Sequence, residues 1–486
     1  MINKNSNGAL AVVRRRHLSM LVAAGFGVAM PVIADALELD YRLKATVAGV
    51  ADGGRDLDLN NADSTAEAYV DMTPWVHLQF NEDWAAFVRV RAYQPSGSLL
   101  QPGNENDNLG ATSKGFVALK EAWVEYGGLT SYPGEVLRLG RQRIRDEDAQ
   151  FLDQEIDALR WIVDTTLLNS ELGVAHQFDS YRSDGADIAR EQKDRTYVFG
   201  HIDYDWIERQ RIGLRVAHAI DDEHLPAPGD TVDPSERNTQ GNLTWIGVYA
   251  DNHSYDWRPI QPQGAELSYW SSATFLSGHR DRIIEDPATH TVVGSAGEDT
   301  HAWAAETGIR ARVAGPVQVG AAYAYSSGGS ADDADRQFEQ TGIQSNYSRF
   351  TGTRTQIYRY NEAYRPELGN LEVASAFASL SEAGYDASLI YNRFRRTQSD
   401  GAVVSDGLSV SPVQDSHDLG DGLDLVMSRY FSLGRASTDE LPDYTPSDDA
   451  ADSSLRLRAS WFNPGKAYGA QAKDEYRVML ELTLWY

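Results

Sequence analysis

Apolar and polar residues alternate with a period of two along much of this chain. In residues 39–47 every odd-numbered position is apolar and every even-numbered position is polar or charged. Residues 68–80 and 84–93 repeat the alternation on either side of the tight turn 81–83, and the final stretch, 476–486, keeps it up to the last residue. Side chains that alternate in this way lie on the two faces of a β-strand. Helical spacing hardly appears, so the pattern predicts an all-β protein.

The pattern predicts about 18 strands. They are expected near residues 38–50, 67–80, 83–93, 116–126, 135–143, 154–162, 168–178, 196–206, 210–219, 240–250, 264–276, 301–313, 317–326, 371–381, 384–395, 422–433, 453–462 and 475–486. The strands at 116–126 and 135–143 carry charge on both faces, which predicts a bulge or a local twist in each.

The connections between these strands alternate between long and short. The odd-numbered connections, beginning with 51–66, are long, acidic and rich in Gly, Asn and Asp, whereas several even-numbered ones, such as 81–83 and 314–316, are tight turns. This sorting is typical of a transmembrane antiparallel β-barrel of the outer-membrane type, with long extracellular loops and short periplasmic turns. A closed barrel in lipid has no free edge, so residues 476–486 are expected to pair antiparallel with residues 38–50.

The N-terminal segment has the order of a secretory signal. Arg14, Arg15 and Arg16 precede an apolar run from Leu18 to Ile33, and small residues follow it. The run is short and rich in glycine, so residues 1–36 are predicted to be a cleaved signal peptide, with a helical membrane anchor as the alternative. Residues 37–486 are then one barrel, located in the outer membrane of a Gram-negative cell.

Composition narrows the possible functions. The formal net charge of −27 argues against a nucleic-acid partner, which requires a basic surface. Cysteine is absent, which excludes thiol catalysis and thiolate metal sites. The zinc-protease, nucleophile-elbow, P-loop and dinucleotide-binding motifs are also missing, so the chain is not expected to be an enzyme or to carry a cofactor.

Two weak metal candidates remain in predicted loops. His218 and His224 flank three acidic residues, but an exposed, solvated charge run explains that pattern better than a metal site. The segment 56–63 has some of the acidic spacing of a calcium loop and lacks its glycine and its distal glutamate. Neither is assigned as a metal site.

The positions expected to face the lumen are rich in cations for such an acidic chain. They are Arg42, Lys44, Arg89, Arg91, Arg141, Arg143, Arg215, Arg354, Arg359, Arg393, Arg456 and Arg458. A barrel of about 18 strands leaves an aqueous lumen, and rings of arginine and lysine select anions there. The alternative is that these arginines pair with lumen carboxylates and brace the wall.

Several long motifs resemble the alginate-export outer-membrane family. They are "GLTSYPGEVLRLGRQRIRDEDAQFLDQEIDALRW" (128–161), "KDRTYVFG" (193–200), "RQFEQTGIQSNYSRFTGTR" (336–354) and "NPGKAYG" (463–469). The resemblance covers essentially the whole predicted barrel. It implies a monomeric barrel of about 18 strands that passes the polyuronate alginate from periplasm to exterior, with periplasmic synthesis and export components as partners.

The resemblance also implies a set of pathway residues. Its electropositive constriction falls on Lys44, Lys120, Arg143 and Arg456, with Arg354 beside them and the carboxylates Asp153 and Asp184 nearby. Three basic positions of the family are Thr73, Tyr347 and Gln356 in this chain, and Arg349 is a candidate replacement for one of them. A less positive constriction predicts weaker charge selectivity.

Residues 434–452 are the candidate periplasmic plug, and residues 94–115 are the candidate extracellular lid. The resulting hypothesis is passive export of alginate, guided by arginine and lysine side chains in the lumen. The alternatives are a general or small-anion porin of the same fold, an outer-membrane enzyme, and a soluble acidic β-protein.

Overall fold

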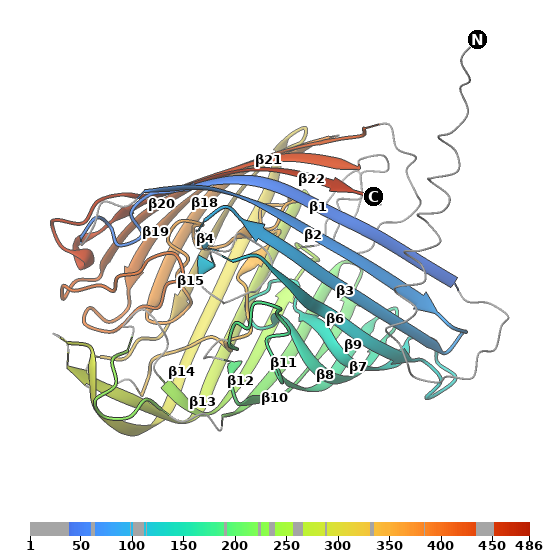
Figure 1. Ribbon diagram of the computed structural model, residues 1–486, viewed down its shortest axis with the longest axis horizontal. Helices are drawn as coiled ribbons and strands as arrows, with labels where there is room; N and C mark the ends of the chain where they lie inside the picture. The colour runs from blue at the N-terminus through green and yellow to red at the C-terminus, as the bar shows by residue number, and fades with distance from the viewer. Residues whose placement is uncertain are drawn as a thin grey trace, which may run out of the picture. The chain divides into compact units, whose positions relative to one another are not determined.

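The computed structural model of the protein is a closed antiparallel barrel of 18 strands (Figure 1). The structure describes residues 38–59, 64–97, 99–100, 111–112, 114–188, 192–221, 225–232, 239–255, 266–286, 289–330, 335–382, 384–433 and 452–486. Each barrel strand pairs with its neighbour along the chain, and the last strand pairs with the first. The predicted fold class is therefore confirmed.

The first half of the barrel consists of nine strands in chain order. They are β1 (Glu38–Asp52), β2 (Thr65–Gln79), β3 (Trp84–Pro95), β6 (Phe116–Tyr126), β7 (Glu135–Arg145), β8 (Asp153–Asp164), β9 (Leu168–His176), β10 (Arg195–Ile207) and β11 (Gln210–Asp221). The second half consists of β12 (Thr239–Asp251), β13 (Leu267–Asp286), β14 (Thr291–Ala314), β15 (Val317–Ser326), β18 (Leu371–Glu382), β19 (Tyr385–Arg396), β20 (Asp418–Phe431), β21 (Ser453–Pro464) and β22 (Glu475–Trp485).

Short elements lie in the loops. Strands β4 (Leu99–Leu100) and β5 (Ala111–Thr112) pair with each other, as do β16 (Tyr347–Ser348) and β17 (Ile357–Tyr358). The single-turn helix η2 (Lys466–Tyr468) precedes β22. Among the described residues, no helix is long and apolar enough to cross a membrane.

The barrel closes at the predicted seam. Strands β1 and β22 run antiparallel from Lys44 opposite Trp485 to Asp52 opposite Arg477. On the inner face of the seam, the hydroxyls of Thr46 and Thr483 lie 3.0 Å apart and are hydrogen-bonded. The terminal alternation of the sequence therefore belongs to a fully paired strand, because closure leaves β22 no free edge.

The two faces of β22 divide as the alternation predicts. Leu480 is 52% exposed on the outer face, whereas Met479, the preceding residue, is 1% exposed on the inner face. Aromatic side chains end the outer row, with Tyr476 beside Trp461 of β21 at one end and Tyr486 at the other. An apolar outer band bordered by aromatic residues is the lipid-facing surface of an outer-membrane barrel.

The connections separate into a short-turn rim and a long-loop rim, as expected. Turns such as 208–209 and 315–316 lie on the short-turn rim, together with Tyr486. On the long-loop rim the prediction was wrong at one place, because β13 and β14 continue to Asp286 and Thr291 where a loop was expected after residue 276. This hairpin stands beyond the membrane band, where water wets both faces and no apolar alternation is required.

Three predicted segments fall largely outside the described residues. The signal peptide, 1–36, lies outside them entirely, and of the candidate plug, 434–452, only Asp452 is described. Within the candidate lid, 94–115, the structure describes residues 94–97, 99–100, 111–112 and 114–115.

Candidate functional site

The part of the β7–β8 hairpin nearest its tip, residues 142–156, leaves the barrel wall. The β6–β7 ladder ends at Ala122 opposite Arg141, whereas β7 and β8 stay paired up to Arg145 opposite Asp153. A loop segment takes the vacated position beside β6, since the Leu119 N–H donates to the Tyr181 carbonyl at 3.0 Å. The hairpin between residues 142 and 156 is therefore free to turn into the lumen.

Gly140 makes this departure possible. Its φ of +124° lies in a region that favours glycine, and a Cβ at this position would be 2.3 Å from the carbonyl oxygen of Ala122. The expected irregularity in this strand is thus a glycine twist. The expected bulge in the neighbouring strand is also confirmed, because the β3–β6 register shifts between Arg89 and Val90 and leaves Lys120 as the extra residue.

The apolar face of the hairpin packs against the barrel interior. Ile144, Phe151 and Ile156 are at most 2% exposed and belong to a large buried cluster that includes Tyr197 of β10 and Ile343. Burial of these side chains fixes the hairpin inside the barrel. Its other face is left for charged residues.

The charged face of the hairpin looks towards β3 and β6. Glu155 accepts from Arg89 at 2.9 Å and from Lys120 at 3.1 Å, and all three side chains are at most 7% exposed. Arg143 pairs with Asp153 at 2.7 Å. By strand parity Arg141 and Arg143 share a face with Leu139, which is 56% exposed to lipid, so they reach the lumen only because the hairpin turns inwards.

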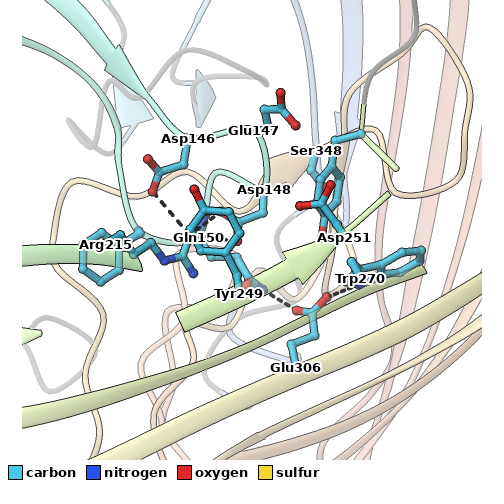
Figure 2. Close-up of polar contacts among 12 residues, drawn as sticks. Asp146, Glu147, Asp148, Gln150, Arg215, Tyr249, Asp251, Trp270, Glu306 and Ser348 are labelled. Atoms are coloured by element: carbon cyan, nitrogen blue, oxygen red, sulfur yellow. Dashed lines mark hydrogen bonds and ion pairs between the residues drawn. The ribbon is translucent and has the colours of Figure 1, made fainter. Parts of the chain in front are cut away.

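The tip of the hairpin, residues 146–152, contacts β11 to β14 (Figure 2). Arg215 of β11 binds Asp146 at 3.4 Å and Asp148 at 2.9 Å. Gln150 donates to the Tyr360 hydroxyl at 2.5 Å and also to Glu306 of β14. The hairpin therefore extends from the β3–β6 side of the barrel to the side formed by β11 to β14.

The two tip aspartates respond differently to their shared arginine. Burial raises the pKa of Asp146 to about 8, with Arg215 opposing the shift. Burial also opposes ionisation of Asp148, but Arg215 and Arg359 outweigh it and lower the pKa of Asp148. One carboxylate of the pair is thus ionised near neutral pH while the other keeps its proton.

A second inward element is the connection between β15 and β18. We call its residues 335–370 the inner loop; most of them are buried, and it contains β16 and β17. The inner loop is bound to β20 and β21, because the Glu362 amide donates to Asp424 at 2.9 Å and the Ala363 amide donates to Ser460 at 2.8 Å. Arg359 of the inner loop pairs with Glu306.

The inner loop brings several predicted cations to the wall of β18 to β22. Arg354 Nη2 donates to the Glu382 carbonyl at 3.0 Å, and Arg349 Nε donates to the Arg354 carbonyl at 3.0 Å. Arg456 of β21 donates to Ser428 at 3.2 Å. The Thr355 hydroxyl lies 3.0 Å from the same Ser428, so Arg349, Arg354 and Arg456 form one neighbourhood.

The remaining predicted residues lie elsewhere. Lys44 is half-buried at the seam, two residues before Thr46 in β1, and the side chains of Lys120, Arg143 and Asp153 lie between the hairpin and β6. Asp184 pairs with Arg182 in the loop after β9, which holds the pKa of that carboxyl below its usual value. The cations predicted for the constriction thus lie in three places: Lys44 at the seam, Lys120 and Arg143 beside β6, and Arg354 and Arg456 at the wall of β18 to β21.

The three positions where the resemblance expected basic residues are buried. Thr73 is in β2, Tyr347 donates its hydroxyl to Glu362 at 2.8 Å, and Gln356 accepts from Arg458 through its carbonyl at 3.2 Å. Arg365 also donates to the Tyr347 hydroxyl at 2.9 Å. A guanidinium therefore lies beside Tyr347 although the residue itself is neutral.

Sequence reasoning missed the carboxylates that hold these cations. Glu121, Glu155, Glu306, Asp386 and Glu481 all bind arginine or lysine in the lumen. The available signal was charge on both faces of the strand at 116–126, which contains Lys120 and Glu121 side by side. Their partners could not be assigned because they come from strands far apart in the sequence.

The metal candidates are not supported as sites. His218 lies in β11 with Nδ1 2.8 Å from the Thr244 hydroxyl, so its placement in an exposed loop was wrong, and His224 is outside the described residues. Of the segment 56–63 only 56–59 is described, and there Asp58 pairs with Lys473 at 3.2 Å. Within the described part of the chain, no group of three acidic or histidine residues could hold a metal ion.

Known proteins are similar in sequence to this chain over most of its length. Residues 43–479 match the family described as "Alginate export". The chain belongs to the alginate export family. The alginate production protein AlgE of Pseudomonas aeruginosa is 37% identical over 444 residues, covering 88% of each chain. AlgE of Azotobacter vinelandii is 31% identical over 480 residues, covering 92% of this chain and 93% of the relative.

Solved porins share the fold of this alginate export family member. OccAB4 of Acinetobacter baumannii has a TM-score of 0.53 at 10% identity, covering 92% of this chain and 98% of that one. OccK2 of Pseudomonas aeruginosa has a TM-score of 0.51 at 10% identity with the same coverage. The closed barrel, its lipid-facing band and the family match show that the chain is a multi-pass β-barrel of the outer membrane. Its family is one of channel proteins and not of enzymes.

Proposed function

We propose that this barrel exports alginate from the periplasm to the cell exterior through its lumen. The observation that carries the proposal is the family match over residues 43–479, supported by relatives that are alginate production proteins. The closed barrel supplies the conduit. The proposal includes the prediction that periplasmic synthesis and export components feed the polymer into a single barrel.

Partly exposed cations are the best candidates for guiding the polymer. The Arg456 side chain is 16% exposed and Arg145 is 17% exposed, whereas Lys120 and Arg143 are only 3% and 5% exposed. Arg349 and Lys44 are also partly exposed. A cation that water reaches can exchange a polymer carboxylate quickly, and conduction requires such shallow, repeated binding.

The buried cations have a different role in this proposal. Breaking a buried ion pair leaves an uncompensated charge, so Lys120 and Arg143 mainly hold the hairpin in place. Bracing thus accounts for one group of predicted residues and guidance for the other. In this proposal, polymer synthesis and the concentration gradient give the transport its direction.

The test uses Arg349→Gln and Arg456→Gln, separately and together, in planar bilayers. Each substitution should lower the anion-to-cation permeability ratio, by up to about fivefold per charge near the path. The double variant should also shorten the current blocks produced by oligouronates. The matched control is Arg429→Gln, an exposed arginine whose guanidinium lies over Tyr385 on the short-turn rim.

Two outcomes would contradict the proposal. If the double variant keeps the ratio and the block of the wild type, lumen cations do not guide the polymer. If neutral oligosaccharides of equal length block the wild type as well as oligouronates do, the protein is a general porin, which is the alternative function.

A further inference from the structure

An aromatic surface lies on the inner wall of the barrel near the short-turn rim. We call Trp75, His77, Phe87 and Trp123 the aromatic platform. His77 of β2 is opposite Phe87 of β3, which is opposite Trp123 of β6. The rings of Phe87 and Trp123 stack with centroids 5.3 Å apart, and Trp75 lies 5.6 Å from Phe87. The platform thus spans three adjacent strands.

The platform faces the lumen. Val124, the residue after Trp123, is paired with Leu139, whose side chain is 56% exposed on the lipid-facing side. Trp123 therefore points to the opposite side, and Phe87 and His77 share its face through the strand register.

Packing within the barrel does not account for the platform. All four side chains are only half-buried, and none belongs to the buried apolar clusters of the described residues. The inner loop treats its aromatic residues differently, since Tyr364 is fully buried and stacks on Phe462 at 4.3 Å. Exposed apolar area in an aqueous lumen costs free energy, so a contiguous patch of it indicates a binding surface.

Cations border the platform. Arg138 lies over the Trp123 ring at 4.1 Å and is held by Glu125, with its side chain 25% exposed. Arg89 lies two residues beyond Phe87 on the same face of β3, within the ion-pair group of Lys120 and Glu155. Apolar rings flanked by guanidinium groups are complementary to a sugar that has an apolar face and a carboxylate edge.

We infer that the aromatic platform is an apolar subsite that contacts the pyranose rings of an acidic polysaccharide. Phe87 and Arg138 cover the two faces of the Trp123 ring, so the C–H groups of a uronate ring would pack on the lumen-facing edges of Trp123 and Phe87 while its carboxylate points to Arg138. A polymer entering at the short-turn rim meets this subsite before the buried ion pairs of the hairpin. The inference rests on the proposed function and adds apolar contact with aromatic rings to charge as a source of binding.

The experiment measures how long oligouronates block single-channel current. Trp123→Leu keeps apolar volume but removes the ring, so dwell times should fall by about tenfold. Trp123→Phe keeps a ring and should retain most of the wild-type dwell time. Phe275→Leu is the control, because Phe275 is 59% exposed on the lipid-facing side and should have no effect.

High salt distinguishes binding by aromatic contact from binding by charge. In about 1 M salt the Debye length is near 3 Å, so charge attraction is screened while apolar contact with the rings persists. The ratio of dwell times between wild type and Trp123→Leu should therefore survive high salt, whereas the effect of the Arg349→Gln, Arg456→Gln double variant should largely vanish.

The outcomes distinguish this inference from the proposed function. If oligouronates block the wild type and Trp123→Leu with equal dwell times, the subsite is refuted and the export function stands. If Trp123→Phe is as impaired as Trp123→Leu, an aromatic ring at this position is not what binds the sugar, and the inference also fails. If oligouronates never block the wild type, both fail. Heat-modifiable gel migration confirms that each variant forms a barrel before it is measured.

Discussion

Buried ion pairs dominate the lumen at the scale of single residues. Glu155 shows this most clearly, because its 2% exposed carboxylate is shared by Arg89 and Lys120. Desolvating three charges is costly, and their mutual attraction offsets that cost only while all partners are present. These arginines and lysines therefore stabilise the structure in addition to making the lumen positive. The identity of the residues alone does not indicate this stabilising role.

Substituting Glu155 should strongly destabilise the barrel. Glu155→Gln leaves two buried cations with too little negative charge, and we expect a loss of about 3–5 kcal/mol in the free energy of unfolding. Urea unfolding in liposomes, followed by tryptophan fluorescence, would measure it. Asp299→Asn is the control, since Asp299 is 81% exposed and its pair with His279 should contribute little. An equal, small effect of both substitutions would show that the Glu155 charge is dispensable.

At the scale of elements, two inward segments define the lumen. The β7–β8 hairpin leaves the wall at Gly140 and docks its tip on Arg215, and the inner loop binds β20 and β21 through Asp424 and Ser460. Both are anchored by side chains from strands distant in sequence. The path for a polymer is thus shaped by elements that the strand pattern alone places on the rim.

Docking of the hairpin tip should weaken as pH rises. An unfolded aspartate loses its proton near pH 4, whereas burial raises the pKa of folded Asp146 to about 8. Between these values the native state binds the extra proton, so its stability decreases as pH increases from 5 to 9. The lowered pKa of Asp148 acts below pH 4 and leaves this window unchanged.

The measurement compares unfolding midpoints of wild type and Asp146→Asn at pH 5 and pH 9. The wild type should lose stability at pH 9 relative to the variant, which has no proton to lose at this position. If the difference between the two proteins is the same at both pH values, Asp146 does not titrate in this range.

At the scale of the whole molecule, closure and lipid contact determine the barrel. Each of the 18 strands pairs on both sides, and β22 completes the sheet by pairing with β1. Outward side chains such as Leu480 then face hydrocarbon, where backbone groups must all be paired. The terminal strand is as constrained as any strand in the middle of the chain.

A charge on the lipid-facing surface should be costly in a depth-dependent way. Leu480→Arg places an arginine in the middle of β22 and should destabilise the barrel by about 2–4 kcal/mol. Leu39→Arg is the matched control, because Leu39 is 50% exposed at the end of β1 on the short-turn rim, where the cost should be about 0–1 kcal/mol. Folding yield into liposomes would measure both. Equal yields would argue against Leu480 lying in the membrane.

The strand pattern alone determined the barrel, its 18 strands and the seam between β1 and β22. Lipid imposes one requirement on every outward position, so alternation can be interpreted residue by residue. The family resemblance named candidate cations, and the structure shows where each of them lies. The sequence also predicted an irregular strand at Lys120 and Glu121, where charge falls on both faces of the strand.

Only the tertiary structure decided how the lumen is filled. Arg141 and Arg143 occupy lipid-side parity and reach the interior because Gly140 lets the hairpin turn. Arg215 meets Asp148, and Arg359 meets Glu306, through contacts between strands and loops far apart in the chain. No local periodicity encodes such contacts, because a loop adopts the conformation that best pairs its charges and buries its apolar side chains against distant residues.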